Sequence, residues 1–349
     1  MQDIKIGKYT VGLGNRPFVV AEMSGNHNHS LERALAIVDA AAAAGVQAVK
    51  LQTYTADTMT LDIHAGEFMV EDPQSLWSGR SLYDLYREAY TPWEWHKPVF
   101  ERCREHGIVG FSTPFDATAV DFLETLEVPC YKIASFEIND LPLIRKVAAT
   151  GKTLILSTGM ATVAEIDEAV RTAKAAGNGK IILLRCTSTY PASPQNSNLL
   201  TMDHMRQLFG CQTGLSDHTL GIGVAVAAVA LGATFIEKHF TLSRHEGGVD
   251  AAFSLEPAEI KQLVEETGRA WQALGAIAYG PTAAEEQSLK HRRSLYLVQD
   301  VQAGDVLTPQ NLRSIRPGLG LSPRYWDIVL GKQVNRSLKQ GTPLRWEYI

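Results

Sequence analysis

The feature that most constrains the fold of this 349-residue chain is a regular alternation between short apolar runs and longer helical patterns. The runs are rich in β-branched residues, and most of them end in polar residues. They are FVVAEM (18–23), AVKLQT (48–53), VGFSTP (109–114), CYKIAS (130–135), TLILST (153–158), IILLRCT (181–187), QTGLSDH (212–218) and FIEKHFT (235–241). Eight strand-then-helix units within about 255 residues predict an α/β fold, a (β/α)8 TIM barrel.

The segments between the runs carry helix signals. Residues 31–42 place apolar side chains at helical spacing, and Gly45 follows as a terminator. Thr162 and Glu165 have the spacing of a capping box, which predicts the start of another helix.

The pattern changes after Leu274, where the polar segment GAIAYGPTAAEEQSLKHRR indicates a linker. We therefore predict a catalytic barrel over residues 1–275, a linker over 276–292 and a small domain over 293–349. The small domain contains an approximate repeat, VQAGDVLTPQNL (301–312) against LKQGTPLRWEYI (338–349), with a turn glycine before an extended apolar run in each copy. About 60 residues provide a marginal core, so we expect this domain to dock against the barrel or a second subunit.

Charge and composition exclude several classes of partner. Lys and Arg total 33 against 38 Asp and Glu, a net charge of −5, so no global positive field holds a nucleic acid or an anionic membrane. The longest apolar stretch, Val224 to Ile236, is too short for a membrane span, and the first ten residues do not resemble a signal peptide. The four widely spaced cysteines favour reduced thiols and a cytoplasmic protein.

Catalytic groups of such barrels lie at the C-terminal ends of the strands. We expect the polar residues there to meet at one mouth: Glu22, Lys50, Gln52, Thr113, Lys132, Ser135, Glu137, Ser157, Ser188, Ser216, His218 and His239. Lysines within buried strands require partners. We interpret Lys238, by contrast, as a side chain that points toward solvent near a strand terminus.

His218 and His239 end consecutive strands, so both imidazoles can face one point. Two histidines suit a divalent transition metal and leave positions open for water and substrate. The alternative, that each histidine is structural, remains open.

The ammonium and hydroxyl groups predict an anion cradle for phosphate and carboxylate, formed by Lys50, Lys132, Thr113, Ser135, Ser188 and Ser216. A Schiff-base aldolase would instead need one lysine with a lowered pKa in a dry pocket. Glu22 and Glu137 suit general acid/base chemistry or binding of substrate hydroxyls, and the sequence does not divide these roles.

The connection from Thr53 to Val109 is much longer than the others and is rich in tryptophan and tyrosine, including Trp77, Tyr83, Tyr86, Tyr90, Trp93 and Trp95. A long aromatic connection at a barrel mouth is typical of a binding loop or lid, with a subunit interface as the alternative.

Taken together, these motifs resemble the sialic acid synthase family over essentially the whole chain. The matching segments, in family order, are AEMSGNHNHSLERA, KLQTYTADTMTLD, FSTPFD, YKIASFE, LSTGMAT, CTSTYPASP, GLSDHTLGIG, IEKHFTLSR, SLEP and IRPGLGL. Within the family, SGNHN, SLWSGRSLYDLYREAYTPWEWH and GGVDAAFSLEP resemble the branch that uses 2,4-diacetamido-2,4,6-trideoxy-L-altrose.

The resemblance implies a transferase that condenses phosphoenolpyruvate with the open-chain aldehyde of that sugar. The products are a nine-carbon 2-keto acid and phosphate, which leaves with C–O cleavage. The family's divalent metal, Mn²⁺ first and Mg²⁺ or Co²⁺ as alternatives, is bound by the histidines that match His218 and His239. It polarises the aldehyde oxygen for attack by C3 of phosphoenolpyruvate.

The resemblance also implies residue roles. Positions matching Lys50, Thr113, Lys132, Ser135, Ser188 and Ser216 hold phosphoenolpyruvate, and those matching Gln52, Tyr190 and Asp250 face the sugar. Glu22 and Glu137 match acid/base or sugar-orienting carboxylates. At Ser188 the sialic enzymes have an asparagine.

The C-terminal segment resembles the antifreeze-like (SAF, β-clip) domain of these synthases. That domain is swapped across a homodimer, so that the arginine matching Arg316 reaches the partner's sugar site. The implied process is the biosynthesis of a flagellin or surface glycan.

Two rivals remain. The first is a sibling synthase for a legionaminic or N-acetylneuraminic acid product. The second is a non-catalytic sugar- or phosphate-binding barrel protein, against which the metal-site histidines and both cradle lysines argue.

Overall fold

The computed structural model describes residues 2–73 and 75–349, in two compact units, Met1–Gly275 and Ala276–Ile349. In the first unit eight parallel strands close into a barrel in chain order, which confirms the predicted fold class. The strands are β3 (Phe18–Glu22), β4 (Ala48–Thr53), β5 (Val109–Pro114), β6 (Cys130–Ile133), β7 (Thr153–Ser157), β8 (Ile181–Cys186), β9 (Gln212–Asp217) and β10 (Phe235–His239).

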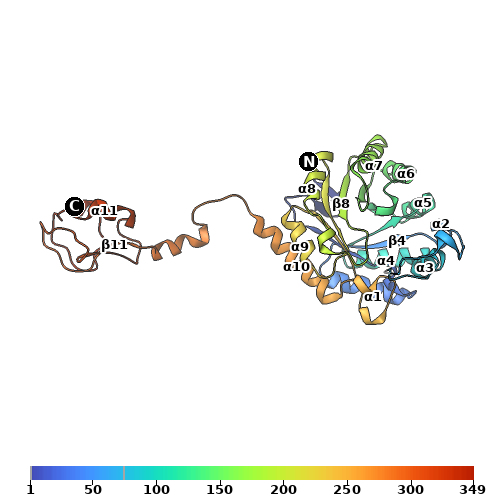
Figure 1. The fold of residues 1–349 in the computed structure, drawn as a ribbon, viewed down its shortest axis with the longest axis horizontal. Coiled ribbons are helices and arrows are strands. Elements are labelled where there is room, and N and C mark those ends of the chain that lie inside the picture. The colour runs from blue at the N-terminus through green and yellow to red at the C-terminus, as the bar shows by residue number, and fades with distance from the viewer. Residues whose placement is uncertain (1, 74) are drawn as a thin grey trace. The chain divides into compact units, whose positions relative to one another are not determined.

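Helices surround this barrel (Figure 1). They are α1 (Leu31–Ala43), α4 (Trp93–Glu105), α5 (Ala117–Thr125), α6 (Leu141–Ala149), α7 (Val163–Ala175), α8 (Thr201–Phe209), α9 (Gly223–Ala230) and α10 (Pro257–Leu274). The predicted capping box is present at the start of α7, where the Thr162 side chain accepts from Glu165 N and the Glu165 side chain accepts from Thr162 N. None of the helices in the described part of the chain is long and apolar enough to cross a membrane.

The β4–β5 connection adds α2 (Ala56–Met59) and α3 (Leu82–Ala89) before α4. Short 3-10 helices complete the chain: η1 (Ser24–His27), η2 (Gly66–Phe68), η3 (Ser135–Glu137), η4 (Pro194–Asn196), η5 (Arg244–Glu246), η6 (Ala251–Phe253), η7 (Ala283–His291), η8 (Pro323–Tyr325) and η9 (Trp346–Tyr348). Ser135 and Glu137 therefore lie in a helical turn directly after β6.

The barrel has two apolar layers, because successive side chains of a strand point to opposite faces. The larger cluster lies between strands and helices, and the smaller one fills the barrel interior. Side chains from an N-terminal hairpin, β1 (Ile4–Ile6) with β2 (Tyr9–Val11), belong to the interior cluster. The sequence analysis did not predict this hairpin.

The second unit contains the pair β11 (Ser294–Leu297) and β12 (Leu312–Ile315) and the short helix α11 (Trp326–Val329). Its two repeat copies pair through backbone hydrogen bonds between Val301 and Leu338. Gly304 and Gly341 follow with φ of +95° and +86°, a conformation that favours glycine at both turns. Part of the segment that the sequence assigned to a linker forms η7.

Lys238 contradicts the prediction that it points toward solvent. The side chain is fully buried, and its Nζ atom lies 2.7 Å from Asp217 Oδ2 of the neighbouring strand β9. Nζ also donates to the carbonyl of Thr219. The prediction was wrong because the end of β10 is covered, so a charge there requires a buried counter-ion.

We expect Lys238→Ala to lower the free energy of unfolding by about 3–5 kcal/mol, because it leaves the Asp217 carboxylate buried without its cation. Urea denaturation measures this loss. The same substitution at exposed Lys97 is the control and should change stability by less than about 0.5 kcal/mol. The double variant Lys238→Met/Asp217→Asn removes both charges and should recover most of the lost stability. Equal losses of stability in Lys238→Ala and Lys97→Ala would contradict a buried ion pair between Lys238 and Asp217.

Candidate active site at the barrel mouth

Glu237 of β10 lies at the centre of the charged groups inside the barrel. Its Oε1 atom is 3.3 Å from Lys132 Nζ and 3.5 Å from Lys50 Nζ, and it accepts a hydrogen bond from Ser216 Oγ at 3.2 Å. All four residues are almost fully buried. One carboxylate therefore joins three of the predicted cradle residues, which come from β4, β6 and β9.

Lys50 has a second carboxylate partner. Its Nζ atom lies 2.7 Å from Glu22 Oε2 and donates to Thr113 Oγ1 at 3.2 Å. The second oxygen of Glu22 is buried without a hydrogen-bond partner among the described residues. The structure thus brings Glu22, Lys50, Thr113, Lys132 and Ser216 together.

The protonation of this cluster follows from its partners. Burial opposes ionisation of Glu237, but Lys132 and Lys50 hold its pKa at about 2. Burial lowers the pKa of both lysines. At Lys50 the two carboxylates outweigh burial and raise the pKa, whereas Lys132, with Glu237 alone at close range, keeps a lowered pKa. The pKa of Glu22 rises to about 7, chiefly through burial.

A second group of donors surrounds Gly159. Its backbone N–H donates to Ser135 Oγ at 3.1 Å. A Cβ atom at this position would lie 2.2 Å from Ser188 Oγ and 2.7 Å from Ser135 Oγ, so only glycine permits the approach of both hydroxyls. The hydroxyls of the predicted serines Ser135 and Ser188 therefore both lie close to Gly159.

His218 and His239 lie next to each other, with ring centroids 5.2 Å apart. Nδ1 of His218 is 2.9 Å from the carbonyl oxygen of Thr187, which orients the ring and leaves Nε2 available. Nδ1 of His239 is buried and has no hydrogen-bond partner among the residues that the structure describes, and Asp250 Oδ2 lies 3.9 Å from it.

The two imidazoles fit a metal ion in their donor chemistry. Burial holds the pKa of His239 well below its usual value, so the ring is neutral and able to ligate. Burial lowers the pKa of His218, but Cys186 and the Thr187 carbonyl outweigh it and raise the pKa, so metal binding at this ring competes with a proton. Among the described residues there is no group of three or more His, Cys, Asp and Glu arranged to hold an ion. A metal held here would keep positions open for water and substrate.

A cavity of about 390 Å³ opens above these groups. Gln52, Glu137, Tyr190 and Asp250 line it together with His239. The pKa of Glu137 rises to about 7, because burial outweighs the attraction of Lys132. The predicted sugar-facing residues and one of the two acid/base candidates therefore share this cavity.

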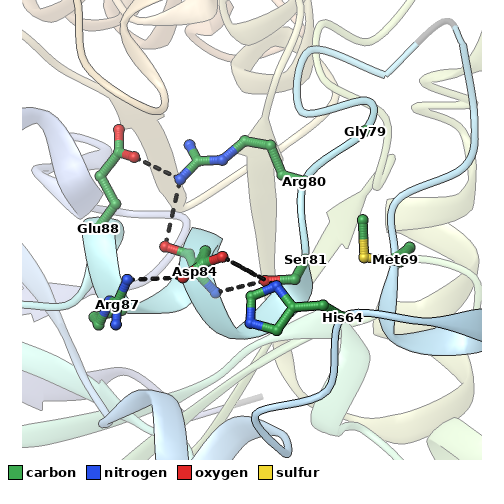
Figure 2. Close-up of a pocket in the computed structure, with 8 residues that line it drawn as sticks. All are labelled: His64, Met69, Gly79, Arg80, Ser81, Asp84, Arg87 and Glu88. Atoms are coloured by element: carbon green, nitrogen blue, oxygen red, sulfur yellow. Dashed lines mark hydrogen bonds and ion pairs between the residues drawn. The ribbon is translucent and has the colours of Figure 1, made fainter.

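A larger pocket of about 530 Å³ lies in the β4–β5 connection, away from the strand ends (Figure 2). Its charged side chains pair among themselves: Arg80 with Glu88 at 2.5 Å, and Arg87 with Asp84 at 2.8 Å. Because these charges are already neutralised within the protein, we place the active site at the barrel mouth.

Glu237 is the residue of the mouth that was not predicted from the sequence, although its alternation with His239 places both on the inward face of β10. Ser157 was predicted to lie at the mouth without a role, and its hydroxyl is buried with no hydrogen-bond partner in the described structure. Arg316 is exposed and follows β12 in the second unit, outside the barrel.

The fold and the site together define a (β/α)8 barrel with a buried cluster of lysines and carboxylates and two neighbouring histidines at its mouth. The sequence profile of the NeuB family matches residues 37–279, and that of the SAF domain matches residues 292–349. The chain belongs to the NeuB family.

Relatives in this family differ in their products. The pseudaminic acid synthase of Helicobacter pylori is 41% identical over 94% of this chain and 96% of its own length. The one from Campylobacter jejuni is 39% identical over 98% of both. The N,N'-diacetyllegionaminic acid synthase of Legionella pneumophila is 36% identical over 95% of this chain and 94% of its own.

A solved structure, the N-acetylneuraminic acid synthetase of Leptospira borgpetersenii, superposes with a TM-score of 0.73. It is 33% identical, and the match covers 83% of this chain and 96% of that one.

The raised pKa of Glu137 predicts a pH dependence of stability. Between its unfolded value of 4.5 and its folded value of about 7, the folded state binds the proton more tightly. The stabilising contribution is therefore complete below about pH 4.5 and disappears as pH rises through about 7.

We expect the melting temperature of the wild type to fall relative to that of Glu137→Gln as pH increases from 5 to 8. Thermal unfolding of both proteins at each pH measures the difference, and both retain Glu22, so its titration cancels. Parallel curves would show that Glu137 has an ordinary pKa.

Proposed function

We propose that this protein is a pseudaminic acid synthase, which condenses phosphoenolpyruvate with 2,4-diacetamido-2,4,6-trideoxy-L-altrose to give pseudaminic acid and phosphate. The observation that carries the proposal is the sequence identity to relatives of known product. Three pseudaminic acid synthases are 39–41% identical over nearly the full chain. The two N,N'-diacetyllegionaminic acid synthases follow at 36% and 33%. We place the reaction in the cytoplasm, where phosphoenolpyruvate is available.

In this proposal the buried ammonium groups bind phosphoenolpyruvate. Lys50 and Lys132 supply charge-assisted contacts to phosphate and carboxylate oxygens, and Thr113 and Ser216 supply hydroxyls beside them. The Gly159 amide with Ser135 and Ser188 gives a second set of polar groups facing the same mouth.

His218 and His239 would hold the metal on which synthases of this family generally depend, with Mn²⁺ as our first candidate. A divalent ion there supplies Lewis-acid polarisation of the aldehyde oxygen. Gln52, Tyr190 and Asp250 orient the sugar in the cavity above.

The reaction forms one C–C bond and replaces one C–O bond at C2 with another. C3 of phosphoenolpyruvate attacks C1 of the aldehyde, whose oxygen takes a proton, and water adds at C2 and loses one proton. The remaining proton of the new C2 hydroxyl passes to phosphate, which leaves with the bridging oxygen, and C2 becomes the keto carbon. Glu137 and Glu22, whose pKa values lie at about 7, can each hold or release a proton near neutral pH. We leave the division of these two transfers between them open.

Product analysis tests the proposal against its rivals. The protein is incubated with a divalent metal, phosphoenolpyruvate labelled with ¹⁸O at the bridging position, and one of three sugars: the L-altrose derivative, its manno-configured counterpart and N-acetylmannosamine. We expect a nine-carbon acid from the first sugar and ¹⁸O in the released phosphate. His218→Ala should reduce turnover at least about a thousandfold. A product only from another sugar would identify a sibling synthase, and tight binding without any product would indicate a non-catalytic barrel.

We further propose the division into a barrel (1–275), a linker (276–292) and a SAF domain (293–349) that is swapped across a homodimer. In this arrangement Arg316 reaches the partner's sugar site. A core of about 60 residues is marginal on its own, and a two-fold exchange would bury it while forming two identical composite sites.

Mixing two inactive variants, His218→Ala and Arg316→Ala, tests the exchange. Each heterodimer would contain one site with both residues intact, so random pairing should restore about a quarter of wild-type activity. As a control, each variant is cross-linked separately into homodimers before the two are mixed. Without subunit exchange this mixture should stay inactive. No recovery despite demonstrated subunit exchange would place Arg316 over its own barrel or outside the site.

A further inference from the structure

Helix α3 in the β4–β5 connection has two chemically different faces. Leu82, Leu85, Tyr86 and Ala89 line the cavity at the barrel mouth, and their spacing is that of one face of a helix. The other face carries Asp84, Arg87 and Glu88, which lie in the polar network drawn in Figure 2. The cavity therefore has a helical wall that is apolar except for one tyrosine hydroxyl.

Polar and apolar side chains both line the cavity. The polar ones include Gln52, Glu137, His239 and Asp250, from the barrel strands and the segments that follow them. The β4–β5 connection contributes apolar side chains, which are the α3 residues with Met59, Val70 and Trp77. Further apolar lining comes from segments that follow the strands: Phe115, Ala134, Phe136 and Val249. A ligand that lies beside His239 can therefore also contact the apolar residues of the connection within the same cavity.

The apolar wall is held in place at three points. A Cβ atom on Gly25 would lie 3.3 Å from the Cα atom of Ala89, so α3 packs closely on η1. Trp77 Nε1 donates to the carbonyl of Val249 at 3.1 Å, next to Asp250. On the outer face, the Arg80–Glu88 ion pair joins the start of the helical segment to its end. A wall fixed in this way can discriminate between ligands by shape and polarity.

We propose that the apolar face of α3, with Leu82 as a contact residue, selects acceptor sugars that end in a methyl group over those that end in a hydroxymethyl group. The inference rests on the proposed function, in which the aldehyde carbon reacts beside His239 and C6 lies at the far end of the chain. A 6-hydroxyl placed against this wall would lose its hydrogen bonds to water without replacement, whereas a methyl group gains apolar contact. Leu82 is thus assigned as a specificity residue and takes no part in the chemistry.

The test compares two sugars that differ in one oxygen atom: 2,4-diacetamido-2,4,6-trideoxy-L-altrose and its 6-hydroxy counterpart. The measured quantity is the ratio of kcat/KM for the two sugars, in the full-length protein with metal and saturating phosphoenolpyruvate. We expect the wild type to favour the 6-deoxy sugar, and Leu82→Ser to narrow the ratio by about tenfold, since a polar side chain removes the penalty on the hydroxyl.

Two further variants separate specificity from general damage. Leu82→Met keeps an apolar side chain and should retain the wild-type ratio. Leu76→Ser makes the same change on the same connection at an exposed leucine that does not line the cavity, and it should also leave the ratio unchanged. KM for phosphoenolpyruvate should be the same in all four proteins.

An unchanged ratio in folded Leu82→Ser, or an equal narrowing in Leu76→Ser, would overturn the inference. Failure of the proposed function has a different signature, because the wild type would then make no product from either L-altrose sugar. In that event the same comparison with the manno-configured pair, which also differs only at C6, decides whether the wall selects a methyl group.

Discussion

The barrel mouth depends on one interaction, the contact of the Glu237 carboxylate with two buried ammonium groups. Lys50 and Lys132 come from different strands, point into the same interior and are almost completely excluded from water. Without an anion between them, two like charges in a medium of low polarity would repel each other or lose their protons. Glu237 lies within 3.5 Å of both, and its low pKa shows that the charged form is the stable one. Glu237 is thus an internal counter-ion for the two lysines that we propose as ligands of phosphoenolpyruvate.

In the proposed function this counter-ion also determines how an anionic substrate is bound. Two ammonium groups and one carboxylate leave a net charge of about +1 before Glu22 is considered, so Glu237 compensates part of the buried positive charge and the remainder attracts phosphate. Glu22, with a pKa of about 7, adds a proton-dependent charge beside Lys50. The same cluster can therefore adjust to the arrival of negative charge by binding a proton at Glu22, with no rearrangement of the barrel.

The parts of the fold that were predictable are those in which local pattern and tertiary environment agree. The eight strands follow from apolar runs with polar ends, and α7 begins at its predicted capping box. The hairpin of Ile4–Ile6 and Tyr9–Val11 escaped prediction because strands of three residues carry almost no periodic signal.

In the run FIEKHFT, polar residues occupy both faces of the strand. The sequence alone therefore did not reveal that Glu237 faces the lysines while Lys238 pairs with Asp217. Partner choice across strands depends on the register of the closed barrel.

Helix α3 shows how the same connection can serve structure and selectivity at once. Ion pairs on its outer face are partly exposed and individually weak. Together they mainly fix the orientation of the helix and add little to the stability of the protein. Its inner face presents apolar side chains to a cavity that polar side chains of the barrel mouth also line. In the proposed reaction the charged groups at the strand ends bind phosphoenolpyruvate and perform the chemistry, so they must be retained whatever the acceptor sugar. The helical wall takes no part in the proposed chemistry, so its residues can change with the sugar while the barrel stays the same.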